Sequence, residues 1–592
     1  MTLNNGTTTS PGPTAGAART PGYAGTLAAA CAAVFVAQVA NALPASLNGL
    51  LQEDLHTRGS QLTWITAAFM IAVVCFEFTF GVLGDLFGRR RLVVAGTALV
   101  AVGSGVAALA PTVQVLWVGA ALNGLGAGAM FPGSLTAITS VTRTARERAH
   151  AVAVWSGFLS AGAAVSPLLG GMFAKVGSWR GSFWVLVGLA LAGAVLTLVL
   201  ATESKAPEGR RFDVPGQITF AVGLILVLYG AVEGPESGWT TLPVLLAFAL
   251  GACFLAAFVL VELGAESPIL DLRLFRNRAF TVSSVAAVIG MLAFLGACFA
   301  TSMWLGPVQH QDPIRVAIPF LLLQGPAFLL IPVVSRLLHR VAASWLLTSG
   351  FVLMAIGCLL CTRLDVTDPH LGPFVAPALL IGVGFALTVS SVTAVALDSV
   401  PQQLAGMASA TTNMLRDLGF ALGPVVVGSV ALSNAGSDFS ASLSGAELPA
   451  GQAAAARAVA EAGGPVAVNS LPPGAPGSAA HGLALDALGS GFGTAFLVCG
   501  VAAAVAAALT AVGMIGVRSH RSAPSGGGRA GAAGPRRQPG VGARRVADTG
   551  AGSSRGSPRA PPHGRAPVTT TGARPRRPGR ERAGRITPHA LT

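Results

Sequence analysis

Charged side chains are rare in this sequence, so an acid that interrupts an apolar run is the first candidate for chemistry. Glu77 lies in the apolar run that begins near Leu62, and it is the only acid deep in the first six apolar runs. A carboxyl group in apolar surroundings loses hydration, so its charged form is disfavoured and reversible protonation becomes easier. We predict that Glu77 is a proton-coupling residue. Pairing with a neighbouring polar group for packing is an equally weighted alternative.

A second group of charges stands where one apolar run ends and the next begins. The sequence from Gly81 to Arg91 reads Gly-Val-Leu-Gly-Asp-Leu-Phe-Gly-Arg-Arg-Arg. The acid can pair with a cation or face the positive end of a nearby helix, and the glycines permit close backbone approach. Because this turn lies at a membrane surface, we predict a conformational latch, meaning contacts that hold one conformation, rather than catalysis. Its predicted members are Gly81, Gly84, Asp85, Gly88, Arg89, Arg90 and Arg91.

Other polar residues also fall within apolar runs. Amide side chains in lipid need partners, so they face a cavity or another helix. We predict Gln38, Asn41 and Asn123 as cavity-lining residues, and for Gln38 and Asn41 helix–helix bonding is nearly as good an interpretation. Arg416 and Asp417 are adjacent at the expected start of a helix, and we predict that they neutralise each other as an ion pair rather than bind substrate.

The fifth apolar run combines a proline with paired glycines. Pro167 removes a backbone donor and bends a helix, while the glycines let a neighbouring helix approach. We predict a hinge here, with a static kink as the alternative. Its residues are Ser166, Pro167, Gly170 and Gly171.

Cofactor and metal sites are not predicted. The glycine run from Asn123 to Gly133 lacks a preceding strand and a closing Lys-Ser/Thr pair, so close helix packing through Gly124 and Gly128 is the better interpretation than nucleotide binding. All seven cysteines fall inside apolar runs, where small core residues are more common than metal ligands or disulfides. The chain therefore carries no Walker loop, metal set or nucleophile constellation that predicts an enzyme.

The elements that must position these residues are membrane helices. The chain of 592 residues is 52% hydrophobic and only 10% charged, whereas soluble domains carry about 25% charge. A membrane span needs roughly 20 apolar residues, and the sequence offers about fourteen such stretches. Long alternating segments of the kind found in membrane barrels are missing. We predict an all-α, polytopic membrane protein with about 14 transmembrane helices, as two six-helix bundles plus two intervening spans.

Polar breaks divide the chain into segments. We predict a disordered cytoplasmic N-terminus, a six-helix bundle, a cytoplasmic linker, two extra spans, a second six-helix bundle that contains an external loop, and a disordered basic cytoplasmic tail. In the order just given, these segments are residues 1–23, 24–201, 202–216, 217–262, 280–517 with the external loop at 433–490, and 518–592. A cleaved signal peptide at the N-terminus is disfavoured, since a basic leader is missing.

The distribution of charge predicts orientation. The net charge of +14 lies in the tail, where 16 Arg face only Asp548 and Glu581. Among the loops, those expected inside hold 14 Lys and Arg, and those expected outside hold 6. This bias predicts a multi-pass protein of the cell (cytoplasmic) membrane with both termini cytoplasmic. The tail can attract anionic lipid, but it has no aromatic residue for base stacking, so we predict no specific nucleic acid partner.

The turn from Gly81 to Arg91, with the arrangement of six, two and six spans, resembles the fourteen-span drug:proton antiporter branch of the major facilitator superfamily. The bent fifth span resembles the antiporter motif of that branch, with Ser166-Pro167 where Gly-Pro is usual. Two positions depart from the pattern. Ala120 stands where the family usually has an arginine, and Phe35 where it usually has an acid, and both groups are tied to proton coupling in relatives.

The resemblance implies a secondary active transporter that exports small amphipathic drugs or metabolites by alternating access, coupled to protons. Because the usual charges are replaced at Ala120 and Phe35, the hypothesis that Glu77 does the work of the missing acid follows. The alternatives are a facilitator or importer of a small solute without proton coupling, and a channel-like membrane protein. Expected partners are a small amphipathic substrate, protons and membrane lipid.

Overall fold

The structure is a computed structural model that describes residues 22–515, except 58, 177, 206–212, 266–267, 269, 271 and 401–404. The predicted N-terminal segment lies outside the described residues except for 22 and 23, and the basic tail 518–592 lies wholly outside them. The linker is described at 202–205 and 213–216. The described chain is helical. Its elements are α1 Tyr23–Ser46, α2 Asn48–Leu55, α3 Gly59–Phe87, α4 Arg89–Ala108, α5 Val113–Val141, α6 Ala145–Lys175, α7 Arg180–Leu200, α8 Val214–Ser237, α9 Leu242–Gly264, η1 Leu272–Arg276, α10 Arg278–Met303, the π-helix η2 Trp304–Val308, α11 Pro313–Leu329, α12 Ile331–Arg340, α13 Ala343–Cys361, α14 Gly372–Asp398, α15 Ala405–Gly445, α16 Ala450–Asn469, η4 Ser478–Ala480 and α17 His481–Gly513.

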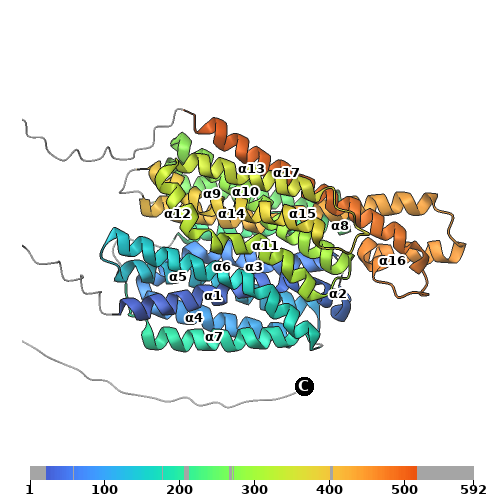
Figure 1. Cartoon of the computed structure of the whole chain (residues 1–592), viewed down its shortest axis with the longest axis horizontal. Helices are drawn as coiled ribbons and strands as arrows, with labels where there is room; N and C mark the ends of the chain where they lie inside the picture. The colour runs from blue at the N-terminus through green and yellow to red at the C-terminus, as the bar shows by residue number, and fades with distance from the viewer. Residues whose placement is uncertain are drawn as a thin grey trace, which may run out of the picture. The chain divides into compact units, whose positions relative to one another are not determined.

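The long helices form two bundles and an extra pair. In the first bundle, α1 packs on α6, and α4 packs on α5 and α7. In the second, α10 packs on α15 and α17, and α13 packs on α14 and α17 (Figure 1). The pair α8 and α9 pack on each other, and α8 also contacts α3 and α15. The extra helices therefore lie against both bundles through α8.

The two bundles meet through reciprocal helix pairs. The second long helix of the first bundle, α3, contacts α15, which is the fifth of the second bundle. The fifth of the first bundle, α6, contacts α11, which is the second of the other bundle. A side chain at one of these two contacts therefore has neighbours from both bundles.

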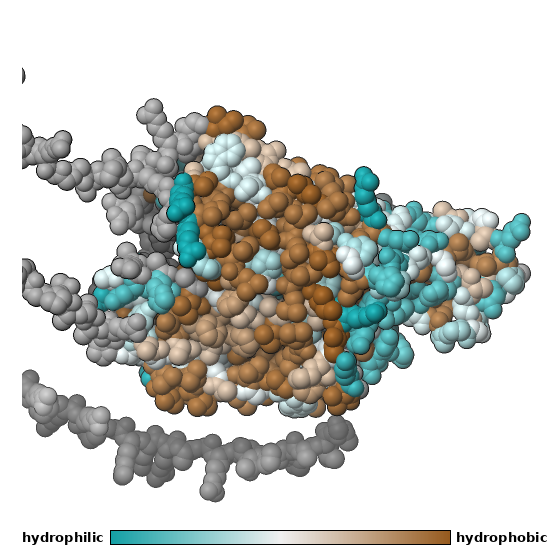
Figure 2. Space-filling view, in the orientation of Figure 1, coloured by the Kyte–Doolittle hydropathy of each residue, from teal (hydrophilic) through white to brown (hydrophobic). Residues whose placement is uncertain are grey.

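Length and composition make these helices membrane spans. Among the described residues, thirteen helices are long and apolar enough to cross a membrane, and α11 with α12, a pair bent by 47°, make a fourteenth when counted as one span. The prediction of an all-α protein with about fourteen spans is thus confirmed. Figure 2 shows an apolar band over the helices, with hydrophilic residues gathered around α16.

Two boundaries differ from the expected ones. The loop expected from residue 433 begins only after Gly445, because α15 has 41 residues and is about 60 Å long, twice the thickness of an apolar membrane core. The last span begins at His481 rather than near Gly491, since η4 leads directly into α17.

Beyond the membrane, the end of α15, α16 and the start of α17 share a small apolar core of their own. Phe439 and Leu443 from α15 pack with Ala456 and Val468 from α16 and with Ala484 from α17. Here α16 is interrupted at Gly463 and Gly464, whose backbone angles are not helical. The expected external loop therefore contains a helix, α16, that is kinked at these two glycines.

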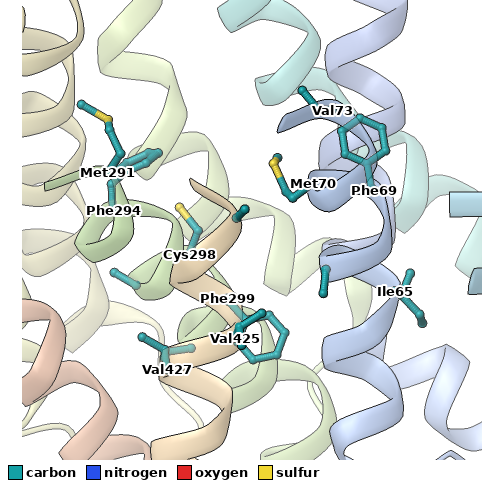
Figure 3. Packing of buried hydrophobic residues seen from close by; sticks show 14 of the residues in the cluster. Ile65, Phe69, Met70, Val73, Met291, Phe294, Cys298, Phe299, Val425 and Val427 are labelled. Atoms are coloured by element: carbon teal, nitrogen blue, oxygen red, sulfur yellow. The ribbon is translucent and has the colours of Figure 1, made fainter. Parts of the chain in front are cut away.

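Small residues allow the helices to approach closely. An added Cβ on Gly126 of α5 would meet the side chain of Val100 on α4 at 2.7 Å, and one on Gly124 would collide with the Phe69 carbonyl of α3. The predicted role of this glycine run in packing therefore fits its position. Between the bundles, Met70 of α3 and Phe294 of α10 belong to one continuous apolar cluster (Figure 3).

Candidate functional site

The turn between α3 and α4 is built around an ion pair. Gly88 separates the helices with a φ of 121°, a region that favours glycine. Asp85 in the last turn of α3 and Arg89 at the start of α4 are four residues apart, and Arg89 Nη2 is 2.9 Å from Asp85 Oδ1. Arg89 Nη1 also donates to the Thr136 carbonyl near the end of α5, at 3.1 Å. The ion pair thus connects α3, α4 and α5, all in one bundle. We call this end of the helices the Gly88 end.

Glu203 completes the turn, and the sequence did not point to it. It follows α7, and its Oε1 accepts hydrogen bonds from the backbone N–H of Arg90 at 3.2 Å and of Ser204 at 3.1 Å. Its Oε2 lies 3.8 Å from Arg91 Nε. A carboxylate therefore occupies the N-terminus of α4, where the helix dipole favours an anion. The latch role of the turn remains a prediction, because it requires a second conformation.

A buried polar cluster lies at the contact between α3 and α15. Glu77 on α3 is 9% exposed, and its carboxyl group lies within hydrogen-bonding reach of the Asp417 carboxyl. Arg416 Nε is 2.9 Å from Asp417 Oδ1, and Arg416 Nη1 donates to Asn413 Oδ1 at 3.3 Å. The Arg416 guanidinium is also near enough to attract Glu77. The ion pair between Arg416 and Asp417 thus has a third member from the other bundle, which the sequence did not indicate.

This cluster contains two carboxyl groups and one guanidinium. Two carboxyl groups can share a hydrogen bond only when one of them holds a proton. If both are ionised, one cation faces two anions in a medium where charge interactions are strong. Among the described residues no donor reaches Glu77 Oε2, which is fully buried. The arrangement can therefore hold one proton at the boundary between the bundles.

The amide residues occupy different surroundings. Gln38 and Asn41 are half-buried on α1, and the backbone of α6 approaches Gln38 at Gly162. Asn123 is buried between α4 and α5, where its Oδ1 accepts a hydrogen bond from Ser104 at 3.1 Å. This bond joins two helices of one bundle, and cavity lining by any of the three amides remains a prediction.

The predicted hinge lies within α6. Ser166 is buried and its hydroxyl donates to the Val39 carbonyl of α1 at 3.0 Å, and helix continues through Pro167. An added Cβ on Gly170 would lie 2.7 Å from Ser46 Oγ on α1, and one on Gly171 would lie 2.9 Å from Ile314 on α11. Gly171 therefore stands at the contact between the bundles. Bending at this point remains a prediction.

At the opposite end of the helices, which we call the α16 end, both bundles are joined to α16. Asn469 Nδ2 donates to the carbonyls of Pro307 and Val308 at 3.2 and 2.9 Å, and lies 3.2 Å from His310 Nε2. On the other side, Gln52 of α2 donates to Ser470 Oγ at 2.9 Å. Nothing in the sequence indicates this connection, because its members are uncharged and far apart along the chain.

The described residues bring together no three His, Cys, Asp or Glu side chains that could hold a metal ion.

The fold and the buried interbundle cluster define a polytopic membrane transporter of the two-bundle class. A sequence profile of the Major Facilitator Superfamily matches residues 29–424. The chain belongs to this superfamily, and the family predicted from its motifs is confirmed.

Relatives with drug-resistance names share most of the chain. The Multidrug resistance protein Stp of Mycobacterium tuberculosis is 30% identical over 64% of this chain and 70% of that protein. The Tetracenomycin C resistance and export protein of Streptomyces glaucescens is 29% identical over 82% and 90%. The Multidrug efflux pump LfrA of Mycolicibacterium smegmatis is 31% identical over 64% and 75%. These similarities place the chain in the fourteen-span branch.

Solved structures support the fold. A mutant of the nucleoside transporter NupG matches with a TM-score of 0.55 and 11% identity, over 82% of this chain and 99% of that chain. A bacterial homolog of the lysosomal transporter Spinster matches with a TM-score of 0.55 and 15% identity, over 83% and 97%. At such low identity the similarity concerns the fold alone.

Proposed function

We propose that this protein exports small amphipathic compounds by alternating access, in exchange for protons that bind at Glu77. The observation that carries the proposal is the position of Glu77, buried on α3 and facing Asp417 and Arg416 across the contact between the bundles. Drug-like substrates are supported by the names of the relatives, which are resistance and export proteins.

The charge of this contact depends on the proton. With one proton on the two carboxyl groups, the cluster is neutral, and Glu77 and Asp417 can share a hydrogen bond. Without it, two carboxylates on opposite bundles repel each other, and only Arg416 offsets the repulsion. Two polar side chains that join α3 to α8 close to Glu77 are uncharged: Gln217 of α8 donates to the Cys75 carbonyl, and Thr79 donates to Gln217. Proton occupancy thus changes the free energy of bringing α3 and α15 together.

We also propose that the Gly88 end faces the cytoplasm. Arg89, Arg90 and Arg91 lie at this end, together with Lys205 and Arg278, in keeping with the excess of positive charge in cytoplasmic loops. Both termini would then be cytoplasmic. A cysteine introduced at Ser444, beyond the membrane at the α16 end, should react with an impermeant maleimide added to intact cells, and lack of reaction would reverse this orientation.

The test uses inverted membrane vesicles with an imposed proton gradient and a fluorescent cationic dye. We expect gradient-driven dye uptake by the intact protein, and its loss in Glu77→Gln at equal protein levels. The matched control is Glu233→Gln, since Glu233 is a half-buried acid on α8 that lies outside the cluster and accepts a hydrogen bond from Trp64. Uphill uptake that persists in Glu77→Gln contradicts the coupling role. Uptake by the intact protein that ignores the gradient favours a facilitator.

A further inference from the structure

A groove opens at the Gly88 end between α4 and α7, with a volume of about 480 Å³. Arg90 and Arg91 line one end of the groove, and Glu203 lies beside them. Val94, Ala95 and Ala98 of α4 form its floor, and Leu198 of α7 forms its wall. The groove is separate from the cluster at Glu77, and the proposed transport cycle does not use it.

The charged end of the groove suits an anion. The Arg91 side chain is 74% exposed, and its Nε lies 3.8 Å from Glu203 Oε2, which is a weak contact. Arg90 donates from its guanidinium to the Leu198 carbonyl at the end of α7, which fixes the guanidinium at the groove. Glu203 Oε1 already accepts the Arg90 backbone N–H, so a carboxylate is bound beside the two arginines. Two cations and one acid leave one positive charge at this end.

The rest of the groove is apolar and follows the helix into the membrane span. Arg91, Val94, Ala95 and Ala98 recur at intervals of three and four residues, so they lie on one face of α4 and extend over about 10 Å of the helix axis. The methyl side chains of Ala95 and Ala98 are exposed, and Leu198 is 47% exposed. Small residues on α4 beside a larger one on α7 thus leave an apolar channel along the helix surface.

A cation at the membrane boundary above an apolar channel matches the two parts of a phospholipid. We propose that this groove binds one anionic phospholipid, with the phosphate on Arg91 and Arg90 and an acyl chain along Ala95 and Ala98. The phosphate competes with Glu203 for Arg91, so a bound lipid lies directly beside the turn that joins α3 and α4. In the orientation proposed above, this lipid belongs to the cytoplasmic leaflet.

The test is native mass spectrometry of the purified full chain, titrated with phosphatidylglycerol and with phosphatidylcholine of the same acyl chains. We expect phosphatidylglycerol to bind more tightly, and Arg91→Gln to weaken it about fivefold, the factor for one lost arginine contact at a membrane surface. Ala98→Trp should weaken it as well, because the indole fills the groove and leaves every charge in place. Arg315→Gln, an exposed arginine at the α16 end, is the matched control and should bind as the intact protein does.

Three outcomes overturn the proposal. If phosphatidylglycerol and phosphatidylcholine bind equally well, the groove does not prefer an anionic headgroup. If Arg91→Gln and Arg315→Gln bind phosphatidylglycerol equally well, the lipid does not bind at Arg91. Displacement of the lipid by millimolar inorganic phosphate, with Ala98→Trp unchanged, identifies a free anion site without an acyl groove. Ala98 is exposed on the surface of α4, so its variant retains the fold and keeps the test valid if Arg91→Gln does not fold.

Discussion

Glu77 of α3 faces Asp417 of α15 across the contact between the two bundles, and Arg416 pairs with Asp417 at 2.9 Å. The three side chains are adjacent only because α3 and α15 pack against each other. Ala120 and Phe35 occupy positions where the family pattern has charges, so the proposed proton coupling rests on this cluster among the described residues.

Removing the second carboxyl group should change the pH dependence of transport. In Asp417→Asn, the two side chains can no longer share a proton between carboxyl groups, so transport should become less dependent on pH. The measurement is the initial rate of dye uptake in vesicles between about pH 5 and 9. Because both carboxyl groups act on one proton, the double variant with Glu77→Gln should lose no more activity than Glu77→Gln alone. Additive losses would mean that the two residues act separately.

Gly88 should be intolerant of a side chain. Its φ of 121° is strained for alanine, and an added Cβ would lie 2.6 Å from Glu203 Oε1. We expect Gly88→Ala to lower the free energy of unfolding by about 1–3 kcal/mol, seen as a lower thermal midpoint in detergent. Gly105→Ala is the control, since this glycine lies in α4 with no atom within 4 Å of an added Cβ. If Gly88→Ala has a thermal midpoint at or above that of Gly105→Ala, a side chain at residue 88 does not destabilise the turn.

The connection at the α16 end should contribute to stability. Asn469 is 2% exposed, and Asn469→Ala leaves the carbonyls of Pro307 and Val308 without these donors. An unsatisfied buried group costs about 1–3 kcal/mol, so a lower thermal midpoint is expected. Ser444→Ala, at an exposed hydroxyl that bonds only within α15, should change it little. If the two variants unfold at the same temperature, Asn469 does not hold α16 in place.

A pH effect on stability is expected from Asp54 of α2. Hydrogen bonds from Trp179 Nε1 at 2.9 Å and Arg180 Nη1 at 2.7 Å lower the pKa of its carboxyl group below the ordinary value of 3.8. A lowered pKa means that the stabilisation is present above pH 3.8 and is lost as the pH falls through the folded-state pKa.

The substitution Asp54→Asn tests this sign. Because the pair is partly exposed, we expect a loss of only about 0.2–1 kcal/mol near neutral pH. The difference from the intact protein should shrink when thermal midpoints are measured at about pH 3, where the carboxyl group begins to protonate. A difference that grows in acid would contradict the direction of the pKa shift.

The sequence by itself determined the class of fold and the local contacts. Apolar runs of span length require helices in a membrane, whatever the packing between them. Asp85 and Arg89 lie only four residues apart around the turn at Gly88, where they pair at 2.9 Å. Arg416 and Asp417 are neighbours in sequence and also pair. Such contacts depend on a few consecutive residues, so they can be predicted from the chain alone.

Only the tertiary structure decided which distant residues meet. Glu203 reaches the Arg90 backbone, Asn469 reaches the π-helix η2, and Glu77 reaches Asp417, and in each case the partner lies on another element. Apolar runs in lipid carry weak information about which helix face packs on which neighbour, because lipid and protein are equally apolar. The packing of small residues between helices selects the neighbours, and with them the partners of each buried charge.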